Sequence, residues 1–117
     1  VKYHTASVCV PPAYIRRIHE TYGDKVNICT VVGFPLGYSV TEAKVEEVRQ
    51  ALADGCNEID MVINIGWLKD QKYDLIENEI RTLKAVCGDK ILKVIIETCF
   101  PQICLISSQV DGWRRRV

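Results

Sequence analysis

The chain has 117 residues, of which 48% are hydrophobic, and this length suits one modest domain with a single core. Fifteen basic and fifteen acidic side chains cancel to a net charge of zero, so bulk charge attracts neither nucleic acid nor an anionic membrane. No apolar run approaches the roughly 20 residues that cross a bilayer, and the first residues do not resemble a signal peptide. The sequence therefore predicts a soluble cytoplasmic protein with no nucleic-acid or membrane partner.

Four β-rich stretches alternate with three amphipathic ones along the chain. The β-rich stretches are short and rich in branched side chains, and they predict strands at residues 7–10, 26–32, 58–64 and 91–97. The amphipathic stretches have apolar residues at helical spacing, and they predict helices between Pro12 and Gly23, between Ser39 and Gly55, and between Tyr73 and Gly88. This alternation indicates right-handed βαβ units around a parallel sheet.

The connections carry further local signals. The glycines and proline of residues 33–37 predict an ordered loop after the second strand. Ser39 or Thr41 is the expected cap of the second helix, and Ser39 and Glu42 have capping-box spacing. Residues 66–70 are interpreted as a loop. Because no Gly-x-Gly-x-x-Gly or phosphate-loop pattern follows a strand, a barrel with ligands at the carboxyl ends of its strands is favoured over a nucleotide-binding fold.

The cysteines do not have the spacing of a metal site. Six cysteines form no Cys-x-x-Cys pair, and only His4 and His19 are available as histidine ligands. Cys9 and Cys29 lie inside apolar runs, where cysteine commonly acts as a small buried hydrophobe. We expect reduced thiols and no metal centre, although the sequence alone leaves a disulfide open.

A single charge interrupts each of the last two strands. Alternation of side chains puts Ile59, Met61 and Ile63 on one face of the third strand and Asp60 on the other. Lys93 occupies the equivalent position on the fourth strand. Strands buried on both faces usually read as continuous apolar runs, so these two charges need an explanation.

Pairing is the simplest explanation for the two charges. If the strands are neighbours in register, Asp60 and Lys93 face one enclosed space and each reduces the cost of burying the other. The pair is then either a structural ion pair, with Lys93 able to reach solvent near a strand end, or a functional pair. In the functional case the carboxylate relays protons and the lysine acts as a base or an amine nucleophile. A triad hydrolase is disfavoured, because neither histidine lies near a nucleophile pattern.

Several segments resemble, in order and spacing, the deoxyribose-phosphate aldolase family. The resemblance runs from Val1 to about Cys99, and the Gly-Phe-Pro-x-Gly loop combined with the Glu-Ile-Asp-Met-Val-Ile-Asn strand is a specific match. The matching segments are Ser7-Val8-Cys9-Val10-Pro11, residues 31–37, Glu46-Glu47-Val48, residues 54–64, and residues 92–98.

The resemblance implies a class I aldolase on a (β/α)8 TIM barrel, which uses a lysine Schiff base. Its reaction is the reversible cleavage of 2-deoxy-D-ribose 5-phosphate to D-glyceraldehyde 3-phosphate and acetaldehyde, without a metal or organic cofactor. Asp60 matches the family's proton donor and acceptor. Lys93 matches a supporting lysine beside that aspartate, and not the Schiff-base lysine.

The chain also departs from the family pattern. The family's Schiff-base lysine lies on a later strand reading like Phe-Ile-Lys-Thr-Ser-Thr-Gly, followed by a helper lysine and phosphate-binding loops, and none of these patterns is present. A complete barrel has eight strands and roughly 250 residues. We therefore expect residues 1–98 to form a partial TIM-barrel domain with about four parallel strands and three intervening helices. Because the first residue is Val, we interpret the chain as a processed product or a fragment. Because the Schiff-base lysine has no match, we expect the chain to be nearly inactive alone.

Residues 99–117 form an atypical tail that resembles nothing in the family. A reading-frame shift or a mis-called gene end would explain it, as would a disordered or genuine segment that covers a sheet edge. The first explanation is favoured, because a β-rich patch and an arginine triplet fit no helix expected after a barrel strand.

The open edges of half a barrel motivate a second hypothesis. A non-catalytic half-barrel would associate through its edge strands with a copy of itself, as a homo-oligomer, or with another chain. A third hypothesis, another Schiff-base or phosphate-sugar barrel enzyme, is disfavoured by the Gly-Phe-Pro-x-Gly loop.

Overall fold

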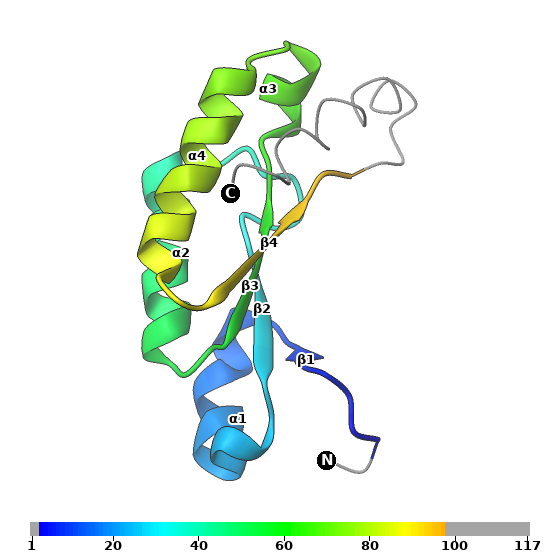
Figure 1. Cartoon of the computed structure of the whole chain (residues 1–117), viewed down its shortest axis with the longest axis vertical. Coiled ribbons are helices and arrows are strands. Elements are labelled where there is room, and N and C mark those ends of the chain that lie inside the picture. The colour runs from blue at the N-terminus through cyan, green and yellow to red at the C-terminus, as the bar shows by residue number, and fades with distance from the viewer. Residues whose placement is uncertain (1–2, 98–117) are drawn as a thin grey trace.

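The computed structural model describes residues 3–97, which form a four-stranded parallel sheet with its long helices on one side (Figure 1). The strand order follows the chain, so each strand is joined to the next by a crossover on the same side. The strands are β1 (Val8–Cys9), β2 (Ile28–Val32), β3 (Glu58–Val62) and β4 (Ile91–Ile95). This arrangement confirms the predicted α/β fold with four parallel strands.

The helices occupy the three predicted crossovers. The first contains η1 (Pro12–Tyr14), α1 (Ile15–Tyr22) and η2 (Gly23–Lys25), the second α2 (Thr41–Ala53), and the third α3 (Ile65–Lys69) and α4 (Tyr73–Cys87). Within residues 3–97, no helix is long and apolar enough to span a membrane. The short helix α3 is an addition to the three predicted helices.

The prediction of a loop at residues 66–70 is wrong because Asn64 acts as a helix cap. Its side-chain oxygen accepts a hydrogen bond from the backbone N–H of Trp67 at 3.2 Å. Asparagine at this position satisfies one of the free donors in the first turn of a helix. The glycine at position 66 favoured a loop, and the cap together with the buried side chain of Leu68 outweighs it.

The predicted capping box at the start of α2 is also wrong. The helix begins at Thr41, its N-cap residue is Val40, and no side chain accepts a hydrogen bond from its first turn. The Thr41 hydroxyl donates instead to Oε1 of Glu79 on α4, at 3.2 Å. The start of α2 is therefore fixed by a contact with another helix and not by a local cap.

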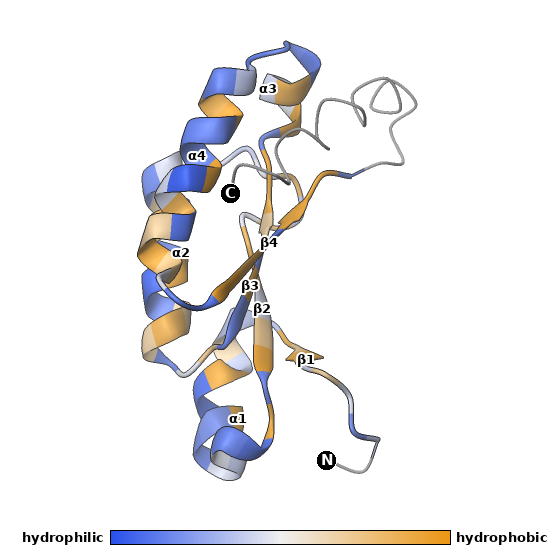
Figure 2. Ribbon diagram, in the orientation of Figure 1, coloured by the Kyte–Doolittle hydropathy of each residue, from blue (hydrophilic) through white to orange (hydrophobic). Residues whose placement is uncertain are grey.

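The core lies between the sheet and the helices. Ile59 and Met61 of β3 are fully buried on the helix-facing side, as the alternation of the sequence predicted. Figure 2 shows the hydrophobic residues of the helices turned toward the strands. Complete burial of a side chain of this size contributes about 1.5–3 kcal/mol. The helix residues of the same cluster include Val45, Val48, Ile76, Ile80 and Leu83.

A buried ion pair joins α2 to α4 inside this core. Nζ of Lys44 lies 2.9 Å from Oε2 of Glu79, and both side chains have no exposed surface. The same ammonium donates to the carbonyl of Val62 at 3.0 Å, at the carboxyl end of β3. Lys44 thus connects two helices with the end of the strand that carries Asp60. No prediction from the sequence assigned either side chain to the core.

The loop at residues 33–37 packs against this ion pair and the end of β3, and its predicted order is confirmed. A side chain at Gly33 would place Cβ 2.8 Å from Cε of Lys44. Gly37 has a φ of +67°, and a Cβ there would collide with the carbonyl of Ile63. The N–H of Gly37 closes the loop by donating to the carbonyl of Gly33 at 2.8 Å. Both glycines are therefore required by close approach.

Lys44→Met tests the buried pair by leaving the Glu79 carboxylate without its cation. Breaking a buried pair in this way costs about 3–5 kcal/mol, and we expect the free energy of unfolding to fall by that amount in urea titrations followed by circular dichroism. Arg81→Met is the control, because it removes an exposed pair with Glu77 on α4 and is expected to cost less than about 1 kcal/mol. Equal losses in the two variants would contradict the importance of the buried pair.

Gly37→Ala tests the close approach of the loop to β3. Gly88→Ala is a matched control, because Gly88 also has a positive φ, +59°, but no atom lies within 4 Å of its added Cβ. Gly88→Ala measures the cost of a positive φ in alanine without a collision, and its ψ of −120° makes that cost larger than the roughly 1–2 kcal/mol of the left-handed helical conformation. We expect Gly37→Ala to lower the thermal midpoint further, because the backbone of β3 must also move. Similar midpoints would contradict the collision.

Candidate active site

The pairing of β3 with β4 brings the two predicted charges together. Asp60 is the register partner of Lys93, and Nζ of Lys93 lies 2.8 Å from Oδ1 of Asp60. This oxygen is buried, and the contact is an ion pair whose direction does not meet the geometry of a hydrogen bond. The Asp60 side chain is 21% exposed and that of Lys93 46%. The prediction of neighbouring strands in register with a paired Asp60 and Lys93 is confirmed.

A second carboxylate, which had no predicted role, shares the same ammonium. Nζ of Lys93 lies 3.0 Å from Oε2 of Glu58, and the Ser7 hydroxyl donates to that oxygen at 3.2 Å. Glu58 precedes Asp60 by two residues and therefore points to the same face of β3. The spacing of two residues could have indicated a role for Glu58. Two carboxylates on one face of a strand can both contact a cation on the neighbouring strand.

The two carboxylates decide the protonation state of Lys93. The pKa of Lys93 is raised above its ordinary value, mainly by Asp60. Burial opposes this increase, and Glu58 adds a smaller increase of its own. Lys93 is therefore an ammonium ion at neutral pH. The interpretation of this lysine as a base or an amine nucleophile is wrong in this arrangement, because both roles need the neutral amine.

Cys29 of β2 completes the surroundings of Lys93. Its thiol is buried and accepts a hydrogen bond from Nζ of Lys93 at 3.6 Å. Burial raises the pKa of Cys29 to about 12, and the nearby Asp60 adds to the increase. The prediction of a small buried thiol is confirmed for Cys29. For Cys9 it is wrong, because Cys9 lies on the edge strand β1 and is exposed.

Among residues 3–97, three potential metal ligands meet beside the ion pair. The sulfur atoms of Cys9 and Cys29 and a carboxylate oxygen of Asp60 lie within 4.8 Å of one another. Spacing along the chain does not reveal this group, because its members come from three strands. The ammonium of Lys93 already contacts Oδ1 of Asp60 at 2.8 Å, so a metal ion bound to that oxygen would have to compete with it. This donor set does not fit a metal centre in its present form.

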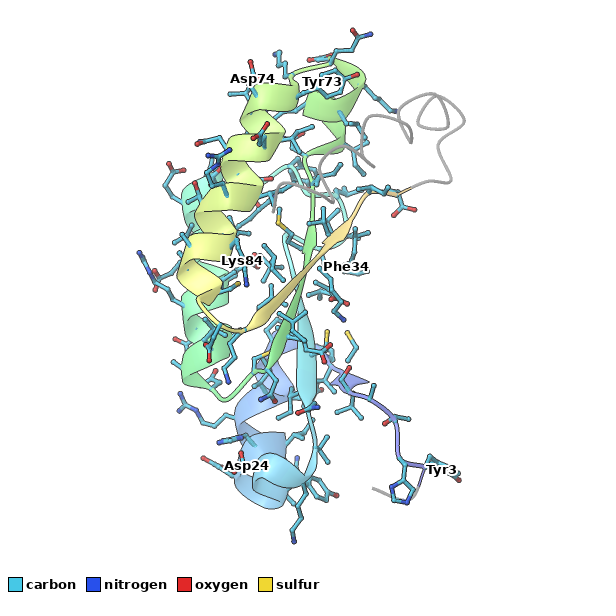
Figure 3. The ribbon with its side chains drawn as sticks, viewed as in Figure 1. Tyr3, Asp24, Phe34, Tyr73, Asp74 and Lys84 are labelled. Carbon is cyan, nitrogen blue, oxygen red and sulfur yellow. The ribbon has the colours of Figure 1, made fainter. Side chains whose placement is uncertain are left out.

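The loop at residues 33–37 borders a small cleft at the carboxyl end of the sheet. The cleft has a volume of about 240 Å³, and Glu47 of α2 lines it and accepts a hydrogen bond from the N–H of Gly33 at 2.9 Å. Phe34 is 62% exposed and lies beside the sheet on the side away from α4 (Figure 3). Barrel enzymes bind their ligands at this end of the strands.

The comparisons with known proteins give the chain its family. The model of the family described as DeoC/LacD family aldolase matches residues 1–109. The chain belongs to this family. A deoxyribose-phosphate aldolase of Clostridium botulinum is 69% identical over 100 residues, which cover 86% of this chain and 45% of that protein. A deoxyribose-phosphate aldolase of Clostridioides difficile is 51% identical over 100 residues, with 86% and 46% covered.

The fold agrees with solved members of the family. A deoxyribose-phosphate aldolase from Aeropyrum pernix, described as tetrameric, superposes with a TM-score of 0.77 at 27% identity, covering 97% of this chain and 48% of that chain. The described sheet and helices are thus part of a TIM barrel. The chain spans about half the length of the curated relatives that it matches.

The family match extends beyond residue 98, which was the predicted end of the aldolase domain. The predicted atypical tail at residues 99–117 lies outside the described residues, and its boundary stays a prediction.

The raised pKa of Lys93 predicts a change in stability under alkaline conditions. The folded-state pKa lies above the ordinary 10.5, so the ammonium contributes stability that is complete below pH 10.5 and is lost as the pH rises through the folded value. In urea titrations, the free energy of unfolding of the wild type should exceed that of Lys93→Met below pH 10.5, and this difference should shrink above pH 10.5. Lys25→Met serves as the control for a lysine outside the site. A difference in unfolding free energy that persists or grows above pH 10.5 would contradict the raised pKa of Lys93.

Proposed function

We propose that this chain is part of a deoxyribose-phosphate aldolase and supplies the proton-relay aspartate, Asp60. The observation that carries the proposal is the Asp60 carboxylate held 2.8 Å from the ammonium of Lys93 on the sheet face opposite the helices. The reaction is the reversible cleavage of 2-deoxy-D-ribose 5-phosphate to D-glyceraldehyde 3-phosphate and acetaldehyde. Membership in the aldolase family and the names of the relatives support it.

The geometry gives Asp60 and Lys93 different tasks. Aldol cleavage moves protons at a hydroxyl group and at the carbon beside a carbonyl, and a positioned carboxylate can take and return them, directly or through one water molecule. Lys93 fixes this carboxylate and offsets its charge. It is a positioning residue, because its ammonium holds Asp60 and Glu58 simultaneously.

In the family the Schiff base forms on a lysine of a later strand. No residue of this chain matches that lysine. Lys93 does not supply the nucleophile, because a protonated amine cannot attack a carbonyl. Loss of a covalent nucleophile costs about a million-fold in turnover in one well-studied hydrolase, and we expect the chain by itself to be nearly inactive. Trapping of acetaldehyde on Lys93 by borohydride, located by mass spectrometry, would overturn this assignment.

A chimera tests whether these residues support the reaction. Residues 1–98 replace the matched segment of the Clostridium botulinum relative, and cleavage of 2-deoxyribose 5-phosphate is followed by the release of acetaldehyde. We expect an active chimera in which Asp60→Asn lowers kcat by about 10²–10⁴, the usual contribution of a positioned acid or base. Asp70→Asn is the matched control, since Asp70 is exposed in the turn after α3.

Borohydride trapping in this chimera distinguishes loss of the nucleophile from loss of the proton relay. Asp60→Asn and Lys93→Met should both still trap a substrate carbonyl, because neither supplies the nucleophile. A fully active Asp60→Asn chimera would refute the proton-relay role. An inactive parent chimera with native circular dichroism would count against the proposed function as a whole.

A second candidate function is a half-barrel that associates through its sheet edges. Among the described strands, β1 and β4 each have one neighbour, and Ile91 at the start of β4 is 53% exposed. An edge strand presents unpaired backbone groups that another chain can pair with. Light scattering after size-exclusion chromatography should then give a mass above one chain. A stable monomer at micromolar concentration would argue against this alternative.

We propose partners, a location and an assembly for the protein on the same basis. The partners would be a phosphorylated sugar and an aldehyde, no metal or organic cofactor would take part, and the protein would work in the cytoplasm as a homo-oligomer. The tetramer described for the Aeropyrum pernix protein supports the last expectation.

A further inference from the structure

Two cysteines face each other across the edge of the sheet. Cys9 of β1 and Cys29 of β2 are register partners, and their sulfur atoms lie within 4.8 Å. Neighbouring strands are about 4.8 Å apart, and cysteines in disulfides have Cα atoms about 4.4–6.8 Å apart. We propose that Cys9 and Cys29 form a reversible disulfide when the protein meets a hydroperoxide. This modification site lies directly beside Asp60.

The two thiols differ in their exposure to solvent, which decides which of them meets the hydroperoxide first. Cys9 is exposed and reaches the oxidant, whereas Cys29 is 1% exposed and does not. Burial and the neighbouring Asp60 raise the pKa of Cys29 to about 12, so its thiol is a poor first nucleophile. In the second step Cys29 attacks a sulfur that already lies within 4.8 Å, and it loses its proton as the S–S bond forms.

The chemistry balances with the hydroperoxide as the two-electron oxidant. The Cys9 thiolate attacks one peroxide oxygen, the O–O bond breaks, and Cys9 becomes a sulfenic acid while the other oxygen leaves as water or an alcohol. The sulfur of Cys29 then attacks the sulfur of Cys9. The S–S bond forms as the S–O bond breaks, and the Cys29 proton leaves with the hydroxyl group as a second molecule of water.

The disulfide would link β1, the shortest of the described strands, covalently to β2. β1 has two residues and pairs with β2 at two register positions, Val8 with Ile28 and Cys9 with Cys29. Beside this ladder, Val8 N–H donates to the Asn27 carbonyl at 2.9 Å and Val10 N–H to the Cys29 carbonyl at 3.0 Å. A covalent link across residues 9 to 29 restricts the unfolded chain and so favours the folded one. We expect the oxidised protein to have a higher thermal midpoint than the reduced protein.

The disulfide would also change the surroundings of the ion pair. In the reduced protein Cys29 accepts a hydrogen bond from Lys93 at 3.6 Å, and a sulfur drawn toward Cys9 moves away from that donor. Oxidation therefore alters the contacts of the ammonium that holds Asp60. This consequence for activity rests on the proposed function, whereas the disulfide itself does not.

Peptide mapping tests the disulfide on the whole chain. The reduced protein is treated with hydrogen peroxide, blocked with iodoacetamide and digested with trypsin, which leaves Cys9 and Cys29 on separate peptides, residues 3–16 and 26–44. We expect a linked pair of these peptides, two hydrogens lighter than their sum, that dithiothreitol separates. Cys9→Ser should abolish the link and the rise in thermal midpoint, whereas Cys87→Ser should keep both.

Other products would overturn the proposal. Linkage of Cys9 to Cys99 or Cys104, or a sulfinic acid on Cys9 with Cys29 still free for alkylation, would show that the pair does not join. In the active chimera, oxidation should change kcat reversibly, and Cys9→Ser should prevent the change. A mapped disulfide with an unchanged kcat would refute the link to Asp60 and leave both the modification site and the proposed function standing.

Discussion

The buried contact of Lys44 with Glu79 is the constraint on which the rest of the structure depends. A charge removed from water must keep every partner it has, because the cost of leaving it alone is several kcal/mol. Lys44 binds a carboxylate of α4 and the carbonyl of Val62 together, so neither helix can slide along the sheet without breaking a costly contact. The carboxyl end of β3, and with it the position of Asp60, is thereby fixed against the helical layer.

Much of this architecture could be predicted because it follows from local periodicity. Alternation along β3 gave the buried face of Ile59 and Met61 and the opposite orientation of Asp60, and parallel strands taken in chain order gave Lys93 as its neighbour. Lys44 was missed, since a lysine in an amphipathic helix normally faces solvent. The helix α3 was missed because a single cap at Asn64 outweighs the glycine after it. The approach of Cys9 to Cys29 depends on register across strands, which no local pattern contains.

Physical geometry and family membership answer different questions about the site. Family membership supports the proposed chemistry, a relay of protons during aldol cleavage. The geometry separates the roles, since an ammonium held by Asp60 and Glu58 cannot be the attacking amine. An ion pair and a relay are therefore not rival interpretations of Asp60. The pairing holds in place the carboxylate that we propose as the relay.

The sharing of one ammonium by two carboxylates has a consequence for what this face of the sheet can receive. Glu58 and Asp60 together have a formal charge of minus two, and Lys93 has a charge of plus one. The net charge of this group is therefore minus one, which favours binding of one further cation. A protonated Schiff base is a cation of that kind. In the proposed function, the negative charge of the strand pair would stabilise this cationic intermediate while the carbon beside it exchanges a proton.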